Sequence, residues 1–338
     1  MTLASLPGLI RFAIVGQLNR DIILPITGPP QIDVLGGNLP YAAVGLKLWD
    51  ETAGLVANVD KDFPSAWLER LRSIGMDVSG IQVSPDPIDM RRFMAHSDPK
   101  TTHFQNPVQH FADRKLPFPS VLLGYQANST GTSHPPTASI QISDIPEAYL
   151  DASAVHICPI DLQSQMTLPS LFRQGQATTI TLCSHPGYMS PTSWEQIPGL
   201  LSEMTAFITS EAEIRNLFQG RRTDLWEMAE VLANFGTDFV LIRTNTQGVY
   251  LFDRNQGRRW IVPNYEANSV DPTGADDAFA GGFLAGYRKY YDPLEATIMG
   301  NIAASLVVEG SGAFYALEAM PGLPELRMEA LKTLVQAL

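Results

Sequence analysis

Residues 269–287 read Ser-Val-Asp-Pro-Thr-Gly-Ala-Asp-Asp-Ala-Phe-Ala-Gly-Gly-Phe-Leu-Ala-Gly-Tyr, a turn that leads into a run of small and aromatic residues. Such a run predicts a buried helix that begins near Gly274. The first N–H groups of a helix have no partner inside it and the helix dipole is positive there, so this end binds anions, phosphate in particular. Gly274 and Ala275 let an anion approach the backbone because neither has a bulky side chain.

Asp277 falls in the first turn of this predicted helix. A carboxylate at that position is within reach of a hydroxyl group brought up to a bound phosphate. Phosphoryl transfer to an alcohol requires an anion-binding site of this kind beside a carboxylate base. The alternative is an acid that only stabilises the helix terminus. We predict that this stretch carries the chemistry, with Asp277 as the base.

The composition is that of a folded protein without a nucleic-acid-binding surface. Of its 338 residues 45% are hydrophobic, and the formal net charge of −12 argues against a nucleic-acid partner. The two cysteines, Cys158 and Cys183, are too few for a disulfide framework and fit a reducing compartment. We find no signal peptide and no apolar run long enough for a membrane span, so we expect a cytoplasmic protein without a membrane partner.

Short apolar runs alternate with amphipathic segments, which predicts an α/β fold with a mostly parallel sheet covered on both faces. Strands are expected over 11–16, 53–59, 154–158, 178–183, 205–209 and 238–244. Helices are expected over 38–49, 62–73, 164–174, 211–219, 223–235, 275–290, 293–308 and 324–338. Turn residues predict hairpins within 21–35, 92–105 and 249–263, and an exposed loop over 128–139.

We predict a single domain, 1–338, in which segments near 18–35 and 85–125 add a small β lid to the core. A closed lid excludes water that would otherwise accept a phosphoryl group. Arg91 and Arg92 fall in this lid, where an exposed arginine is the expectation and contact with a substrate anion is the alternative. Because an exposed sheet edge invites another chain, a homodimer through the lid is also among the predictions.

Other motifs with a known chemistry are absent or interrupted. The sequence holds no Gly-Lys dipeptide, no G-x-G-x-x-G after a strand, no G-x-S-x-G and no H-E-x-x-H. His96, His103 and His110 recur every seven residues, but Pro99 and Pro107 break any helix that would align them. We therefore interpret these histidines as lid or loop residues and not as metal ligands.

The opening stretch together with Gly36-Gly37-Asn38 resembles the ribokinase-like carbohydrate kinases of the PfkB family. The signature of that family is D-T/P-x-G-A-G-D-x-F, and residues 271–279 here read Asp-Pro-Thr-Gly-Ala-Asp-Asp-Ala-Phe. Segments 14–21, 36–45, 210–220 and 242–248 resemble four further motifs in the same order. The resemblance implies a ribokinase-like three-layer α/β/α core with a mostly parallel central sheet and a small β lid.

The resemblance also implies roles for individual residues. Asp277 matches the general base, and the N–H groups of Gly274, Ala275, Asp276 and Asp277 match the anion hole. The sugar pocket is implied at Asn19, Asp21, Gly36, Gly37, Asn38 and Tyr41. The nucleotide side, for ATP, is implied at Ser210, Arg243, Asn245, Gly248, Gly274 and Asn301.

Two kinds of metal ion belong to the same comparison. Glu213 matches an acid that helps to hold Mg²⁺, generally through water. Asp271 and Thr273 match positions near a monovalent cation site, such as a K⁺ site, in some members.

Three positions depart from the family pattern. Asp276 replaces the second glycine of G-A-G-D, which puts a carboxylate beside an anion site and weakens phosphate binding unless the side chain points away or meets a cation. Ser210 stands where asparagine is usual and affects how the metal ion is positioned. Asn245 replaces a glycine of the nucleotide loop, a mild change because asparagine tolerates a left-handed backbone.

Three functions remain open from the sequence. The first is an ATP-dependent kinase for a hydroxyl of a sugar or sugar-like molecule. The second is a nucleoside kinase of the same family, favoured by the aromatic ring of Tyr41, which offers a stacking face for a base. The third is a non-catalytic, ligand-binding protein with the kinase fold, for which Asp276 and Ser210 are the support.

Overall fold

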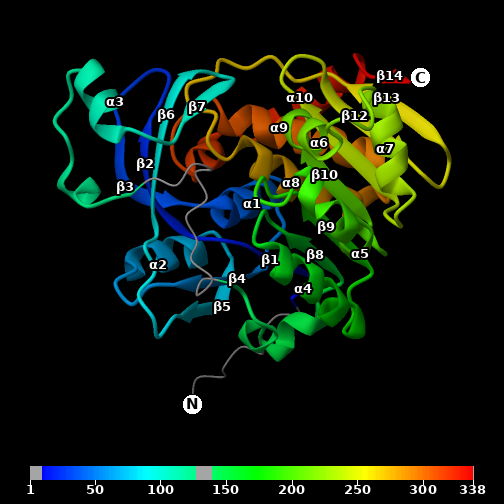
Figure 1. Cartoon of the computed structure of the whole chain (residues 1–338), viewed down its shortest axis with the longest axis horizontal. Coiled ribbons are helices and arrows are strands. Elements are labelled where there is room, and N and C mark those ends of the chain that lie inside the picture. The colour runs from blue at the N-terminus through cyan, green and yellow to red at the C-terminus, as the bar shows by residue number, and fades with distance from the viewer. Residues whose placement is uncertain (1–9, 127–138, 338) are drawn as a thin grey trace.

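The structure is a computed structural model that describes residues 10–126 and 139–337. The loop predicted over 128–139 lies outside the described residues except for its last residue. Two sheets organise the described chain, a large one with the strand order β14-β13-β12-β11-β10-β9-β8-β1-β4-β5 and a small one with the order β3-β2-β6-β7. Figure 1 shows the small sheet at the left of the molecule, beside the large one.

The large sheet is parallel from β5 through β11 and antiparallel from β11 to β14. Its strands are β1 (Phe12–Val15), β4 (Gly54–Val59), β5 (Asp77–Val83), β8 (Ala154–Ile157), β9 (Thr179–Cys183), β10 (Ala206–Ser210), β11 (Phe239–Thr244), β12 (Gly248–Asp253), β13 (Arg258–Val262) and β14 (Gln336–Ala337). The chain passes from β1 to β4 on one side and returns to the other side of β1 at β8. Ligands of open α/β sheets bind outside the carboxyl ends of the strands at such a switch.

Side chains alternate between the two faces of the sheet, so each face has its own core. Phe12 and Ile14 of β1 belong to one buried cluster, and Ala13 and Val15 belong to the other. The first face carries α1 (Asn38–Lys47), α2 (Ser65–Ser73), α8 (Ala275–Tyr290), α9 (Pro293–Val307) and α10 (Leu323–Lys332). The second carries α4 (Leu162–Gln174), α5 (Ile197–Leu201), α6 (Glu211–Leu217) and α7 (Leu225–Ala233). The three-layer α/β/α core that the resemblance implied is therefore confirmed.

The small sheet consists of β2 (Asn19–Leu24), β3 (Gln31–Gly36), β6 (Arg91–Asp98) and β7 (Thr101–His103). It packs with α3 (Pro107–Asp113) around a separate cluster of buried side chains made of Ile22, Leu24, Phe93, Ala95, Phe111 and Leu122. These strands come from the two segments in which the sequence predicted a lid. That the sheet acts as a lid, and that it pairs with a second subunit, stay predictions.

The elements that differ from the sequence-based expectations include β14, α3 and β5, and the short helix α5 was not predicted either. Residues 336–337 form β14 beside β13, where a helix to residue 338 was expected. The helix α3 begins at Pro107, a residue that was expected to break a helix. Proline is tolerated at the first helical position because the N–H group of that position makes no hydrogen bond within the helix. The edge strand β5 was not predicted because its burial pattern is irregular and it contains Gly80, which packs against Tyr149.

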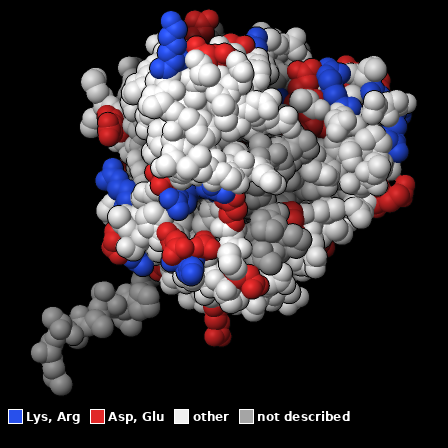
Figure 2. Space-filling view, turned by 60° about the vertical axis from the view of Figure 1, so that its left-hand side comes forward, with Lys and Arg blue, Asp and Glu red and all other residues white. Residues whose placement is uncertain are grey.

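The surface carries charges of both signs. On the face shown in Figure 2, basic and acidic residues occur in small neighbouring groups and form no continuous basic surface. Within the part of the chain that the structure describes, no helix combines the length and the apolar character that crossing a membrane requires.

Candidate active site

A cleft of about 1230 Å³ lies at the carboxyl ends of β8, β9, β10 and β11. Pro159, Cys183, Ser210 and Thr244 line it there, and β6 and β7 contribute Arg92, Met94, His96 and Thr102 from the small sheet. The start of α8 contributes Gly274, Ala275, Asp276 and Asp277. The cleft therefore combines the switch region of the large sheet with the stretch that the sequence singled out.

Gly274 sets the geometry of this helix start. It precedes α8 with φ 78°, a left-handed conformation that favours glycine, and a Cβ atom at this position would lie 2.0 Å from the ring of Tyr41. The chain can therefore turn into α8 while Tyr41 packs directly against the turn. The first N–H groups of α8, from Ala275 to Asp277, begin at the cleft, and helix starts of this kind attract anions.

Asp277 lies in the first turn of α8 and lines the cleft. Burial raises the pKa of Asp277 to about 7, the guanidiniums of Arg92 and Arg243 oppose this rise, and the carboxylates of Asp21 and Glu213 add to it. A carboxylate with a pKa near neutrality is suited to accept and release a proton at physiological pH. The carboxyl group therefore lies in the cleft with a pKa near neutrality, and its role as a base stays a prediction.

Asp276 has a cationic partner. Its side chain is 73% exposed and forms an ion pair with Arg243, which comes from the carboxyl end of β11. The guanidinium of Arg243 also lies 4.9 Å from the ring centroid of Phe279, one turn further along α8. The carboxylate that replaces the family glycine is thus neutralised by a cation on a neighbouring element.

The residues predicted for the sugar pocket lie behind the wall of the cleft. Asp21 is fully buried and accepts two hydrogen bonds from Arg92, at 2.7 and 3.1 Å. The side chain of Asn38 accepts a hydrogen bond from the Gln17 N–H and donates one to the Pro159 carbonyl, which ties two strand ends together. None of the predicted sugar-pocket residues is among those that line the cleft, and on this side Arg92 lines it instead.

Glycines 36 and 37 are required by close packing at the same place. A Cβ atom at Gly36 would lie 1.9 Å from the Asp21 carboxylate, and one at Gly37, where φ is 96°, would lie 2.2 Å from the Gln17 carbonyl. The side-chain oxygen of Asn19 is buried without a hydrogen-bond partner among the described residues.

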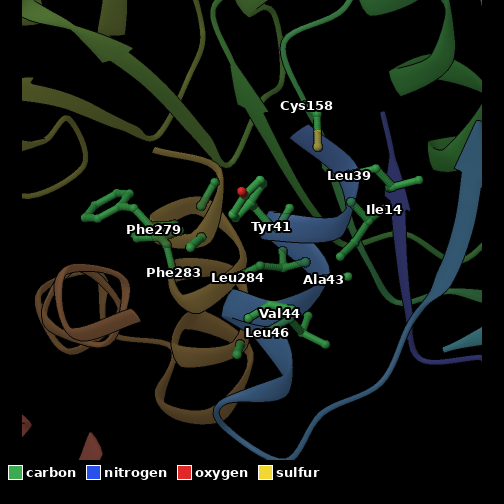
Figure 3. Close-up of a cluster of buried hydrophobic side chains, with 14 of the residues drawn as sticks. Ile14, Leu39, Tyr41, Ala43, Val44, Leu46, Cys158, Phe279, Phe283 and Leu284 are labelled. Atoms are coloured by element: carbon green, nitrogen blue, oxygen red, sulfur yellow. The ribbon is translucent and has the colours of Figure 1, made fainter. Parts of the chain in front are cut away.

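Tyr41 is a core residue in this structure. Its side chain is 1% exposed, and Figure 3 shows the ring between α1 and α8, among Phe279, Phe283 and other buried residues. The ring therefore presents no free face to the cleft, and the stacking role that favoured a nucleoside has no support from its position. The aromatic residues that do line the cleft are Phe104, Tyr265 and Phe279.

Ser210 and Glu213 form a capping box at the start of α6. The Glu213 carboxylate accepts hydrogen bonds from the Ser210 N–H, at 3.0 Å, and hydroxyl, at 2.6 Å, while the Ser210 hydroxyl accepts one from the Glu213 N–H. Burial raises the pKa of Glu213, and the hydrogen bonds from Ser210 oppose this effect. Serine in place of the family asparagine thus fixes the orientation of the carboxylate.

Of the residues predicted for the nucleotide side, five line the cleft, namely Ser210, Arg243, Asn245, Gly274 and Asn301, and Gly248 does not. Asn245 is exposed in the turn between β11 and β12, and its φ is not positive, so the left-handed conformation that would have explained this substitution is absent. Gly248 does have a positive φ of 92°, and a Cβ atom there would lie 2.1 Å from the Val262 carbonyl. Asn301 binds the Tyr265 N–H and the Pro263 carbonyl and so holds the segment that follows β13.

His96 connects the small sheet to the signature turn, a contact that sequence reasoning missed. Its Nε2 atom lies 2.8 Å from the Thr273 hydroxyl and 3.3 Å from Asp271 Oδ1, and its Nδ1 atom lies 2.9 Å from the Thr102 hydroxyl. Asp271 also accepts hydrogen bonds from the Thr273 N–H and the Ser311 hydroxyl. Its carboxylate therefore has partners without a cation. The sequence contained no local signal for this contact because His96 and Thr273 are 177 positions apart.

Comparison with known proteins identifies the family. The profile described as "pfkB family carbohydrate kinase" matches residues 146–320, which is more than half of the chain. A cytidine kinase of Thermococcus kodakarensis is 28% identical over 83% of this chain and 90% of its own length.

Solved structures share the fold at low sequence identity. A ribokinase-like protein of Escherichia coli, solved with ATP and Mg²⁺, superposes with a TM-score of 0.69 at 17% identity, over 96% of this chain and 99% of its own. Aminoimidazole riboside kinase of Salmonella enterica, solved with aminoimidazole riboside and an ATP analogue, gives 0.67 at 15% identity, over 94% and 99%. From the family match, the chain belongs to the pfkB family carbohydrate kinases and is a phosphotransferase of the sugar and nucleoside kinase class.

Proposed function

We propose that this protein transfers the terminal phosphoryl group of ATP to a hydroxyl group of a sugar or a nucleoside, with Asp277 as the general base. The observation that carries the proposal is the Asp277 carboxyl group at the N-terminus of α8, with a pKa of about 7, inside the cleft. Asp277 takes the proton of the acceptor hydroxyl as the oxygen forms its bond to phosphorus and the bond to the ADP oxygen breaks. The N–H groups from Gly274 to Asp277 stabilise the charge of the group in transfer.

The residues of the cleft fit a nucleotide-bound Mg²⁺ ion. Mg²⁺ in such sites takes one or two carboxylates together with phosphate oxygens and water. Glu213 lines the cleft, and its orientation is fixed by Ser210. When bound, the ion neutralises charge on the phosphates, and Glu213 would hold it through water. A monovalent cation beside Asp271 and Thr273 remains an expectation from the resemblance.

The substitution Asp277→Asn tests the proposal. We expect kcat to fall by about 10²–10⁴-fold with ATP affinity nearly unchanged, since asparagine cannot accept the proton. The matched control is Glu227→Gln, which removes an acid from the first turn of α7, outside the cleft. Activity of the Asp277→Asn variant close to that of the wild type would overturn the mechanism.

A nucleoside is the acceptor class that a specific observation favours. The lining of the cleft includes the apolar side chains of Met94, Phe104, Pro186 and Met189. A nucleoside base buries more apolar surface against such side chains than a free sugar does, and therefore gains more binding free energy. The relative from Thermococcus kodakarensis is described as a cytidine kinase. ADP release with cytidine, other nucleosides, ribose and inositol distinguishes the two classes, and nucleotide binding without turnover across the whole panel would support a non-catalytic protein.

A further inference from the structure

Arg243 and Asp276 are an ion pair that joins two elements of the cleft. Arg243 is the fifth residue of β11, and Asp276 is the second residue of α8. Both residues line the cleft, together with Gly274 and Asp277. The pair therefore lies at the same helix start to which the proposed function assigns the phosphoryl group.

The surroundings of the guanidinium leave donors for a ligand. Its flat face is covered by Phe279, and its edge meets Asp276. Burial lowers the pKa of Arg243 to about 10, so the group is largely desolvated yet still charged at neutral pH. Among the described residues, no hydrogen bond from its Nε or Nη2 atom is present. A guanidinium carries five N–H donors and binds phosphate oxygens well, so the unpaired donors match an anion in the cleft.

We propose that Arg243 binds the phosphoryl group that is transferred and that Asp276 is a positioning residue that holds the guanidinium over the N-terminus of α8. This inference rests on the proposed function. A lone carboxylate at position 276 would repel the phosphate, whereas the pair brings no net charge and adds oriented donors. The exchange of glycine for aspartate in the signature is thus coupled to the arginine on β11.

Nucleotide binding tests the role of Arg243 separately from turnover. For Arg243→Met we expect the affinity for the Mg²⁺ complex of a non-hydrolysable ATP analogue to fall at least about tenfold. The affinity for ADP should fall less than about threefold, because only the analogue has the third phosphate. The matched control is Arg259→Met, which breaks another arginine pair, with Glu230 and the Trp226 ring, outside the cleft. Equal losses for the two nucleotides would overturn the proposal.

Turnover tests the coupling to Asp276. We expect kcat to fall by about 10²-fold in Arg243→Met and by about tenfold in Asp276→Gly, with little further loss when Asp276→Gly is added to Arg243→Met. Independent, multiplying losses would show that Asp276 does not act through Arg243. If the proposed function itself is wrong, the wild type is inactive with every acceptor. Binding of the ATP analogue and of ADP to Arg243→Met and to Arg259→Met can still be compared in that case, so the role of Arg243 is tested separately.

The pH profile gives a readout that a purely structural pair would not change. The charged groups that act on Asp277 are Arg92, Arg243, Asp21 and Glu213, and Arg243 lowers its pKa. Removing that cation should therefore move the acidic limb of kcat/KM to higher pH in Arg243→Met, but not in Arg259→Met. An unchanged limb would contradict the placement of the guanidinium beside the reacting groups.

Discussion

Burial raises the pKa of the Asp277 carboxyl group, and two nearby guanidiniums lower it. Burial alone would keep the group protonated, and Arg92 and Arg243 bring its pKa back to about 7. The acid is therefore poised between its two protonation states at neutral pH, as proton transfer in catalysis requires. The cost is that a partly buried charge must be tolerated above pH 7, and this predicts how activity and stability depend on pH.

We expect kcat/KM to fall below pH 7 in the wild type. The folded protein holds the Asp277 proton up to about pH 7, whereas the unfolded chain releases it near its ordinary pKa of 3.8. Because the folded state binds more protons between these values, this group stabilises the fold below pH 4 and loses that contribution as pH rises through 7. Asp277→Asn should therefore be more stable than the wild type at pH 8, by on the order of 4 kcal/mol, and lose this advantage at pH 4.

Urea denaturation of both proteins at several pH values measures the difference, so that other titrating groups cancel. A stability difference that does not depend on pH would contradict the raised pKa.

The residues that the sequence predicted best are those whose role depends on their immediate neighbours. Asp277 has the first-turn position that the sequence predicted, and Gly274 directly precedes the helix, although its left-handed conformation was not predicted. The partners were not predictable in the same way. Arg92 meets Asp21 and Arg243 meets Asp276 only after the strand order brings them together, and no local pattern encodes such contacts.

Among the elements, α1 and α8 approach each other unusually closely. A Cβ atom at Gly281 of α8 would lie 1.9 Å from the Ala42 carbonyl, and one at Gly45 of α1 would lie 2.1 Å from the Ala278 carbonyl. Figure 3 shows the two helices side by side, with buried side chains between them. The position of α8, and with it that of Asp277, therefore depends on these glycines.

Gly281→Ala should force the two helices apart. We expect a loss of about 1–3 kcal/mol in the free energy of unfolding, together with a lower kcat because Asp277 moves with α8. Gly199→Ala in α5 is the control, since its nearest neighbour would be the flexible end of Met166 at 3.4 Å. Thermal unfolding and kcat measure both effects, and equal behaviour of the two variants would refute the packing argument.

The strand β6 connects the small sheet to the signature through His96. Removing the imidazole in His96→Ala breaks the contact with Thr273. A closed lid excludes water, so if the small sheet acts as a lid we expect a kcat/KM for the acceptor about tenfold lower and a larger share of ATP lost to hydrolysis. His103→Ala, on β7 and outside the cleft, is the control. An unchanged ratio of hydrolysis to transfer in His96→Ala would show that this contact does not link the sheet to catalysis.

Element types were predictable where the pattern was long and regular, as in α8 and the strands from β8 to β11. The misses share a physical reason. The two residues of β14 become a strand only because β13 offers an unpaired edge, and β5 is an edge strand whose exposed side chains blur the apolar pattern. Both strands form only because a neighbouring strand of the folded sheet pairs with them, and the local sequence carries no signal for such a neighbour.

For the whole molecule, the cleft lies between two bodies with separate cores. The small sheet packs on its own cluster around Phe93 and Phe111, and its links to the large body include the hydrogen bond from the Ile26 N–H to the Val270 carbonyl. A ligand that touches both bodies should hold them together, because it binds the closed arrangement more tightly than the open one. Bound ligands should therefore make the small sheet open less often, and they should affect the large sheet far less.

Hydrogen exchange measures this directly. With cytidine and the Mg²⁺ complex of a non-hydrolysable ATP analogue both present, we expect amides of β2 and β6 to exchange at least about tenfold more slowly. The exchange rates of amides in β8 to β10 should change little. Either ligand alone should protect less, because it contacts the closed arrangement incompletely. Asp277→Asn, which leaves the binding surfaces in place, should show the same protection as the wild type. Protection spread evenly over both sheets would mean that the ligands stabilise the molecule globally, and the small sheet would then have no role as a lid.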